Sequence, residues 1–164
     1  MQIITVVDID SGNLLSIKRS IENFGIKVKI TKDYKELLNS DKIILPGVGA
    51  FGKAIKKLES IGFKDLILEP KFQNIPTLGI CLGMQLLFEE SEEFGTNKGI
   101  GLIKGKVIKI PISKSNKIKL PHISWNEIET KNIQWENTIL NQVEINSDMY
   151  LSLIHISEPT RLRS

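Results

Sequence analysis

The apolar residues of the first ninety positions form short runs that alternate with segments of helical spacing. Runs of Val, Ile and Leu bounded by Gly, Pro or Asn are typical of strands that are buried on both faces of a sheet. Such runs occupy 3–9, 28–30, 42–45 and 77–80. Apolar residues spaced three or four apart predict helices over 14–24, 34–38, 54–58, 63–72 and 84–90. Strand and helix therefore alternate along this part of the chain, which is typical of an α/β protein.

From residue 100 onward the pattern changes to pieces typical of strands, at 107–110, 122–125 and 143–145. Between them, the Lys-, Ser- and Asn-rich stretch 113–119 is typical of an exposed loop. Strand–helix alternation followed by a β-rich segment predicts an open, mostly parallel sheet with helices on both faces. In such sheets, binding sites form at the carboxyl ends of the strands.

The composition excludes several classes of function. The chain has 164 residues, 41% of them hydrophobic and 25% charged, which fits one globular domain. A net charge of +3 is too small to indicate a nucleic-acid groove or an anionic membrane surface. The single cysteine excludes an internal disulfide and gives no indication of a thiolate metal site. Without a bilayer-length apolar run or a secretory signal, we expect a cytoplasmic protein with no metal, no organic cofactor and no membrane or nucleic-acid partner.

The segment Gly79-Ile80-Cys81-Leu82-Gly83 lies between a predicted strand and a predicted helix. Gly-x-Cys-x-Gly has the form of a nucleophile elbow with sulfur in place of the serine oxygen. The sharp turn strains its central residue, and the two glycines relieve the crowding around it. A helix N-terminus at Cys81 favours the thiolate, and the N–H of Leu82 can donate to an oxyanion. A lone cysteine is more often a buried, inert residue, but the paired glycines favour catalysis here.

One turn further on, Gln85 is placed to hydrogen-bond a polar substrate, although a solvent-facing glutamine would give the same pattern. The segment 79–85 resembles the nucleophile motif of the class I (triad) glutamine amidotransferases. Four other segments narrow the resemblance to the glutaminase subunits of imidazole glycerol phosphate synthases, and the likeness covers 1–150 in order. They are Asp-Ser-Gly-Asn at 10–13, Pro-Gly-Val-Gly at 46–49, Glu-Glu-Ser-Glu-Glu at 89–93, and Pro-His-Ile-Ser-Trp-Asn at 121–126.

This resemblance implies a flavodoxin-like α/β fold and hydrolysis of glutamine to glutamate and ammonia. Cys81 would attack the side-chain amide carbon, release ammonia and form a thioester that water then cleaves. The amide N–H groups of Leu82 and of the Val48–Gly49 turn would form the oxyanion hole. Gln85 and Glu93 would hold the amino-acid end of glutamine.

The resemblance also implies a partner. In this family the ammonia passes to a (β/α)8-barrel cyclase or synthase subunit, which makes an imidazole ring in histidine biosynthesis, so we expect a heterodimer. Asn13, Trp125 and Asn126 match positions near the docking face. A buried core aromatic is an equally good interpretation of Trp125. For Glu89–Glu93, apart from Glu93, a solvated segment is the simpler interpretation.

Two departures from the family pattern change the expected function. Ser124 stands where the family has glycine, which leaves open a related glutaminase that supplies a surface-sugar synthase. The family also pairs its cysteine with a His-Pro-Glu motif beyond the matched residues, whereas the only histidines here are His122 and His155. His122 belongs to the docking motif, and the residues around His155 do not match the catalytic one. Because a cysteine nucleophile needs a base and an acid that orients it, we expect this chain to lack glutaminase turnover.

The likeness stops at Tyr150, and the choice of basic residue changes there as well. Residues 1–150 contain 19 Lys and one Arg, whereas 151–164 contain two Arg and no Lys. We therefore expect 1–150 to be an incomplete amidotransferase domain that lacks its C-terminal strands, and 151–164 to be a non-native tail. Two further functions stay open at this point. One is a small hydrolase or chaperone-like protein with a similar elbow, and the other is a non-catalytic module that only docks on a synthase.

Overall fold

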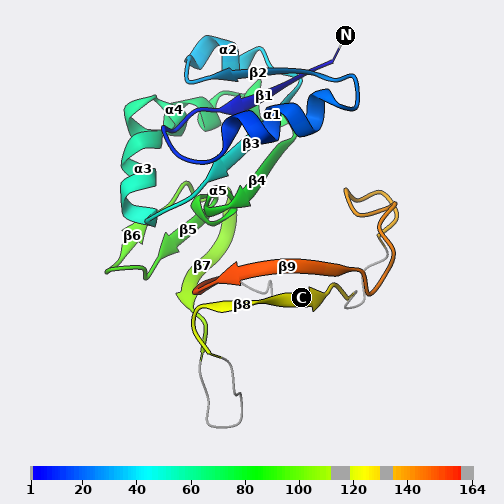
Figure 1. Ribbon diagram of the computed structural model, residues 1–164. Helices are drawn as coiled ribbons and strands as arrows, with labels where there is room; N and C mark the ends of the chain where they lie inside the picture. Colours follow the sequence, from blue (N-terminus) through cyan, green and yellow to red (C-terminus); the bar gives the residue numbers. More distant parts are fainter. Residues whose placement is uncertain (1, 112–118, 130–134, 160–164) are drawn as a thin grey trace. The chain divides into compact units, whose positions relative to one another are not determined.

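The computed structural model describes residues 2–111, 119–129 and 135–159, and the chain divides into two compact units (Figure 1). The first unit comprises the chain up to Ile108 together with the segment from Ser157. The second unit is Lys109–Ile156. Each unit is described by itself below. Within the described ranges, no helix combines the length and the apolar character that a membrane crossing requires.

The first unit is built on a four-stranded sheet in the order β2-β1-β3-β4. Its strands are β1 (Ile3–Val7), β2 (Lys27–Thr31), β3 (Lys42–Gly47) and β4 (Thr77–Cys81). All three neighbouring pairs are parallel, so the predicted parallel sheet is confirmed. The prediction that β3 stops before Pro46 is wrong, because the strand continues through Gly47. Proline has no backbone N–H, and it is tolerated at position 46 because the pairing of β3 with β1 ends at Ile44. No carbonyl of β1 therefore loses a hydrogen bond to Pro46.

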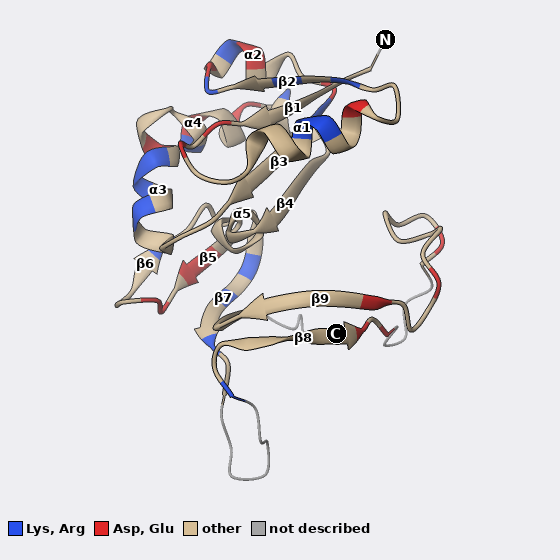
Figure 2. Cartoon of the chain, in the orientation of Figure 1, with Lys and Arg blue, Asp and Glu red and all other residues tan. Residues whose placement is uncertain are grey.

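Short helices connect these strands, and two of them begin at predicted caps. The helices are α1 (Leu14–Glu22), α2 (Tyr34–Leu38), α3 (Phe51–Ser60), α4 (Phe63–Leu68) and α5 (Leu82–Leu86), with a 3-10 turn η1 (Phe72–Asn74). The side chain of Asp33 accepts from the N–H of Glu36 at 2.9 Å and caps α2. Lysines mark α3 along its length (Figure 2).

The core lies on both faces of the sheet because successive residues of a strand point to opposite sides. On one face Val7, Ile43 and Leu45 are fully or almost fully buried against α3, α4 and α5. On the other face Val6 and Ile44 pack with apolar residues of α1. The prediction of helices on both faces is therefore confirmed.

A second sheet follows α5, in the order β10-β7-β5-β6. It consists of β5 (Phe88–Ser91), β6 (Asn97–Lys98), β7 (Ile103–Lys109) and β10 (His155–Pro159). The predicted helix over 84–90 is therefore wrong beyond Leu86. Apolar residues run without interruption from Leu86 to Phe88, and all three are buried. Such a run fits a helix or a strand, and parallel pairing of β5 with β7 decides for the strand.

The second unit contains an antiparallel pair, β8 (His122–Glu127) and β9 (Asp148–Leu153). The strand predicted at 143–145 is wrong, because this segment consists of turns. The N–H of Val143 donates to the carbonyl of Leu140 at 2.8 Å, and Asn146 has a φ of 67°. Side chains that favour turns surround Val143 and outweigh the β preference of the segment. Of the predicted loop at 113–119, all but Lys119 lies outside the described residues.

Leu45 provides a test of the core. Its side chain is fully buried between β3 and the α3–α5 helices, so Leu45→Ala is expected to lower the free energy of unfolding by about 2–5 kcal/mol. Leu68 on α4 is 73% exposed, and Leu68→Ala is expected to stay within about 0.5 kcal/mol of the parent. Urea denaturation followed by circular dichroism measures both. Equal losses in the two variants would contradict this assignment of the core.

Candidate active site

Cys81 occupies a strained position between β4 and α5. Its φ is 55° and its ψ is −120°, a backbone conformation that non-glycine residues rarely adopt. The thiol is exposed, and α5 begins at the next residue. The elbow that the Gly-x-Cys-x-Gly pattern predicts is therefore present, with the sulfur presented at the carboxyl end of β4.

The two flanking glycines are required by close backbone contacts. A Cβ on Gly83 would lie 1.8 Å from the carbonyl oxygen of Leu45 in β3. A Cβ on Gly79 would lie 2.4 Å from the Cα of Met84 in α5. Neither clash involves a flexible side-chain end, so no larger residue fits either position without a backbone shift. The crowding that the sequence predicts is thus the physical reason for the motif.

The Val48–Gly49 turn lies beside this elbow. In the parallel register Gly47 pairs with Cys81, so the turn leaves β3 at the level of the cysteine. The N–H of Val48 donates to Ser11 Oγ at 3.1 Å, and the hydroxyl of Ser11 donates in return to the carbonyl of Val48. The N–H of Gly49 makes no hydrogen bond to any described residue. Of the two expected donors in this turn, the N–H of Val48 is therefore engaged, and the N–H of Gly49 is the one without a partner among the described residues.

Gln85 and Glu93 belong to the same unit as the elbow. Gln85 is half-buried on α5, one helical turn after Cys81, and its amide makes no hydrogen bond to a described residue. A Glu93 carboxylate oxygen accepts from the N–H of Phe51 at 2.6 Å, where α3 begins. Glu93 is thereby held at the far end of the turn that carries Gly49. Their roles toward glutamine stay predictions.

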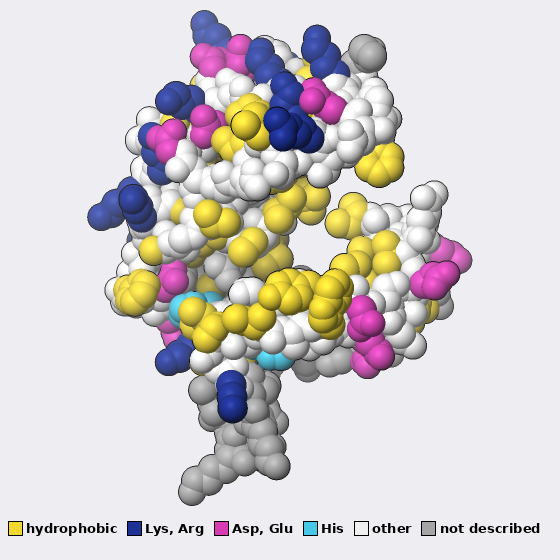
Figure 3. All heavy atoms as spheres, in the orientation of Figure 1, with side chains coloured by type: hydrophobic (Ala, Val, Ile, Leu, Met, Phe, Trp, Pro, Cys, Tyr) yellow, Lys and Arg dark blue, Asp and Glu magenta, His cyan; other side chains and the backbone are white. Residues whose placement is uncertain are grey.

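The residues expected at a partner surface lie in different units. Asn13, in the first unit, is exposed, and its side chain caps α1 by accepting from the N–H of Ser16 at 3.3 Å. Trp125, in the second unit, is 67% exposed and meets Tyr150 edge to face, with ring centroids 5.5 Å apart. The alternative interpretation of Trp125 as a core aromatic is therefore wrong. Figure 3 shows other hydrophobic side chains exposed along the β8–β9 pair.

Asn126 lies on the opposite face of β8, together with His122 and Ser124. The side-chain amide of Asn126 donates to Ser124 Oγ at 2.9 Å, and its oxygen lies 3.2 Å from His122 Nε2. Ser124 Oγ is also 3.2 Å from His122 Nε2. The hydroxyl that replaces the family's glycine is thus part of a small polar cluster. The first unit, which carries Cys81, has no histidine in its sequence.

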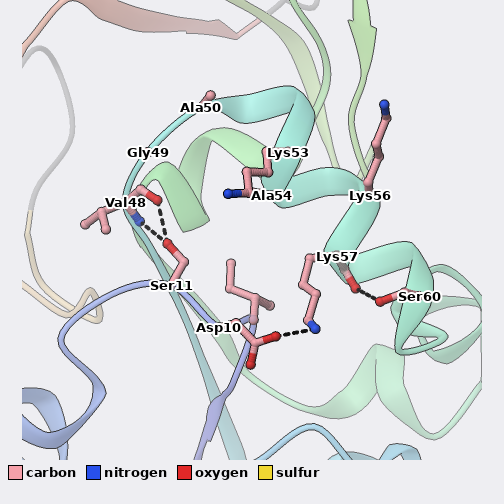
Figure 4. Close-up of a pocket in the computed structure, with 11 residues that line it drawn as sticks. Asp10, Ser11, Val48, Gly49, Ala50, Lys53, Ala54, Lys56, Lys57 and Ser60 are labelled. Carbon is pink, nitrogen blue, oxygen red and sulfur yellow. Dashed lines mark hydrogen bonds and ion pairs between the residues drawn. The ribbon is translucent and has the colours of Figure 1, made fainter.

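A cavity that the sequence reasoning missed lies on the β1 side of the same turn (Figure 4). Its volume is about 680 Å³, and it is bounded by the ends of β1 and β3 and by α3. Asp10 and Lys57 form an ion pair at its wall, and the lysine holds the pKa of the Asp10 carboxyl below its usual value. The available signal in the sequence was the spacing of Lys53, Lys56 and Lys57, of which the last two lie within the helix predicted over 54–58. Within the described ranges, no group of three His, Cys, Asp or Glu side chains is placed to hold a metal ion.

The sequence profile of the family described as "Glutamine amidotransferase class-I" matches residues 5–150. The chain belongs to this family. A solved structure described as "Crystal structure of glutamine amidotransferase" has the same fold, with a TM-score of 0.58 over 75% of this chain and 62% of that chain, at 17% sequence identity. The family resemblance seen in the sequence is thus confirmed.

Curated class I relatives include proteins named "Imidazole glycerol phosphate synthase subunit HisH". The protein of that name from Sulfurimonas denitrificans is 50% identical over 111 residues, which are 68% of this chain and 54% of the relative. The one from Methanocaldococcus jannaschii is 52% identical over 106 residues, which are 65% of this chain and 53% of the relative. The chain therefore spans about half the length of the curated relatives it matches.

The elbow geometry makes a specific prediction for Gly83. Gly83→Ala would drive a methyl group into the β3 backbone, so we expect a loss of about 2–4 kcal/mol in the free energy of unfolding. Gly25→Asn is the control, because a Cβ there meets nothing within 4 Å and asparagine tolerates the φ of +74°. Urea denaturation curves give both values. Matching midpoints for the two variants would show that the turn has room for a side chain.

Proposed function

We propose that the chain is a glutaminase subunit of an imidazole glycerol phosphate synthase, with Cys81 as its nucleophile. The observation that carries this proposal is the strained elbow at Cys81, which presents an exposed thiol beside the Val48–Gly49 turn. Membership of the class I amidotransferase family and relatives near 50% identity support the same reaction. The proposed substrate is glutamine, and no metal or organic cofactor enters the proposed chemistry.

In the proposed reaction the Cys81 thiolate forms a C–S bond to the side-chain amide carbon of glutamine. The carbonyl oxygen becomes an oxyanion, for which the N–H groups of Leu82 and Gly49 are the proposed donors. The C–N bond then breaks, and the nitrogen leaves as ammonia after taking up a proton. Water hydrolyses the glutamyl thioester to glutamate and restores the thiol. Gln85 and Glu93 are proposed to hold the α-amino and α-carboxylate groups.

The first unit, which carries Cys81, lacks a histidine that could transfer the proton in this reaction. A cysteine nucleophile needs a base to take its proton and to return it to the leaving nitrogen. Histidine is the usual base, and the first unit has none in its sequence. We therefore propose that this chain binds glutamine without turning it over. Ammonia release that Cys81→Ala abolishes would contradict this part of the proposal.

The proposed recipient of the ammonia is a (β/α)8-barrel synthase subunit. We propose that the two subunits act together in histidine biosynthesis in the cytoplasm. Asn13, Trp125 and Asn126 are the proposed contact residues. The 67% exposure of Trp125 supports this role, since large aromatic side chains on a surface are frequent centres of protein interfaces.

A second candidate is a related glutaminase that supplies a surface-sugar synthase. Ser124 favours it, because its hydroxyl contacts His122 and Asn126 where the imidazole branch has no side chain. Co-purification of the chain with each type of synthase subunit discriminates between the two candidates.

Covalent labelling tests the glutamine site without requiring turnover. The L-form of a chloroketone analogue of glutamine is expected to alkylate Cys81 at least tenfold faster than the D-form, because only a site that reads the α-carbon distinguishes them. Excess glutamine should protect the thiol, and Gln85→Ala should reduce the preference for the L-form. Since Cys81 is the only cysteine, intact mass spectrometry reports the reaction directly. Equal alkylation rates for the two enantiomers would contradict the proposal, because they would show that Cys81 is an exposed thiol with no pocket that recognises glutamine.

Substitution at Trp125 tests the partner surface. Trp125→Ala is expected to weaken binding to the barrel subunit at least tenfold, because a buried aromatic anchor contributes more than about 1.4 kcal/mol to such an interface. Ile139, also in the second unit and 80% exposed, is the control, and Ile139→Ala is expected to change the dissociation constant less than twofold. Titration calorimetry with the separately purified barrel subunit measures both. Unchanged affinity in Trp125→Ala would place the docking face elsewhere.

A further inference from the structure

The connections of the main sheet create a crevice between β1 and β3. From the carboxyl end of β1 the chain crosses to β2 on one side, and from the carboxyl end of β3 it crosses to β4 on the other side. These two connections therefore diverge at the carboxyl ends of β1 and β3. In open α/β sheets, this topological switch point is where ligands most often bind. Cys81 is the last residue of β4, one strand further along, so the elbow lies outside the switch point.

The cavity of about 680 Å³ lies at this switch point. Ile9, Asp10 and Ser11 line it from the end of β1, and Val48, Gly49 and Ala50 line it from the end of β3. The first turn of α3 and the lysines that follow complete the wall (Figure 4). A volume of this size accommodates a small molecule, and all of its walls belong to the first unit.

The three lysines of α3 are not equivalent. Lys57 points to Asp10 and forms an ion pair with it, so its charge is compensated. Lys56 also belongs to the cavity lining, but its side chain extends away from Lys53 and Lys57 (Figure 4). Lys53 points into the cavity and has no acidic partner among the described residues (Figure 4). Of the two lysines that point into the cavity, Lys53 is therefore the one whose charge no acidic side chain of the described residues compensates.

The turn before Lys53 offers one backbone donor. The N–H of Gly49 has no partner among the described residues, whereas the first N–H of α3, that of Phe51, is already bound by the Glu93 carboxylate. An ammonium is a point charge with three donors, and lysine is a common ligand of phosphate groups. A tetrahedral oxyanion can accept from an ammonium and from backbone N–H groups at the same time, which suits this arrangement.

We propose that the switch-point cavity is a second binding site, which shares the Gly49 turn with the proposed glutamine site but not Cys81, and that it takes a small molecule bearing a phosphate monoester, with Lys53 as the residue that holds the phosphate. The proposal does not depend on the glutaminase chemistry at Cys81. Lys57 keeps Asp10 from repelling the anion, since the pair is neutral as a whole.

Inorganic phosphate is the probe that tests this site. It is titrated into the full chain at constant ionic strength, with sodium chloride as the balancing salt, while backbone amide NMR signals are followed. The signals of Gly49, Ala50 and Lys53 are expected to shift saturably, with a dissociation constant in the millimolar range. Cys81→Ala is expected to bind phosphate as the parent does, which separates this site from the glutaminase function.

Matched lysine variants distinguish phosphate binding at a defined site from nonspecific attraction to the positive charges of α3. Lys53→Gln is expected to raise the dissociation constant at least tenfold, and Lys53→Arg, which keeps the charge, less than threefold. Lys56→Gln removes the same charge one turn away and is expected to change the constant less than twofold. Absence of saturable shifts at 49–53, or equal losses in Lys53→Gln and Lys56→Gln, would overturn the proposal. Because both lysines are exposed, the amide spectrum of each variant also verifies its fold.

Discussion

The close approach of Gly83 to the carbonyl of Leu45 is the contact on which the candidate site depends. It brings the first turn of α5 against the backbone of β3, at a distance that no side chain on residue 83 permits. Gly79 allows the same closeness between β4 and α5. With these contacts in place, Cys81 is left at the corner with a positive φ, and its side chain is directed outward. The strain at the cysteine is therefore sustained by tight backbone packing on both sides of it.

The parallel register extends this constraint to the neighbouring turn. Because Gly47 pairs with Cys81, the Val48–Gly49 turn and the elbow leave the sheet at the same level. The α3–α5 side of the sheet is well packed, with Leu45 and Phe51 fully buried. On the other face, Leu78 of the edge strand β4 lies beside Ile44, and it is 40% exposed. Within the described residues, the sheet face near β4 is thus less completely covered than the face that supports the elbow.

The sequence predicts well where local chemistry decides the structure, and poorly where distant contacts decide it. The main-sheet strands, the cap at Asp33 and the elbow glycines follow from short patterns that need no partner to be recognised. The strand β5 could not be separated from a helix, because Phe88 becomes a strand residue only through pairing with β7. For Trp125 the sequence could not distinguish core from surface, since an apolar residue on a two-stranded pair is buried only if another layer covers it.

The lysine-lined cavity illustrates a different limit of sequence reasoning. Lys53, Lys56 and Lys57 form a charge pattern that is usual for a solvated helix face, and nothing in it separates one lysine from the next. The fold separates them, because Asp10 at the end of β1 meets Lys57 and not Lys53. Ser11, the next residue, holds both polar backbone groups of Val48, so the end of β1 also orients the turn beside Cys81. Asp10 thus shapes the wall of the cavity, and Ser11 determines which N–H groups of the 48–50 turn remain available near Cys81. The 48–50 turn is therefore a wall common to the cavity and to the proposed glutamine site.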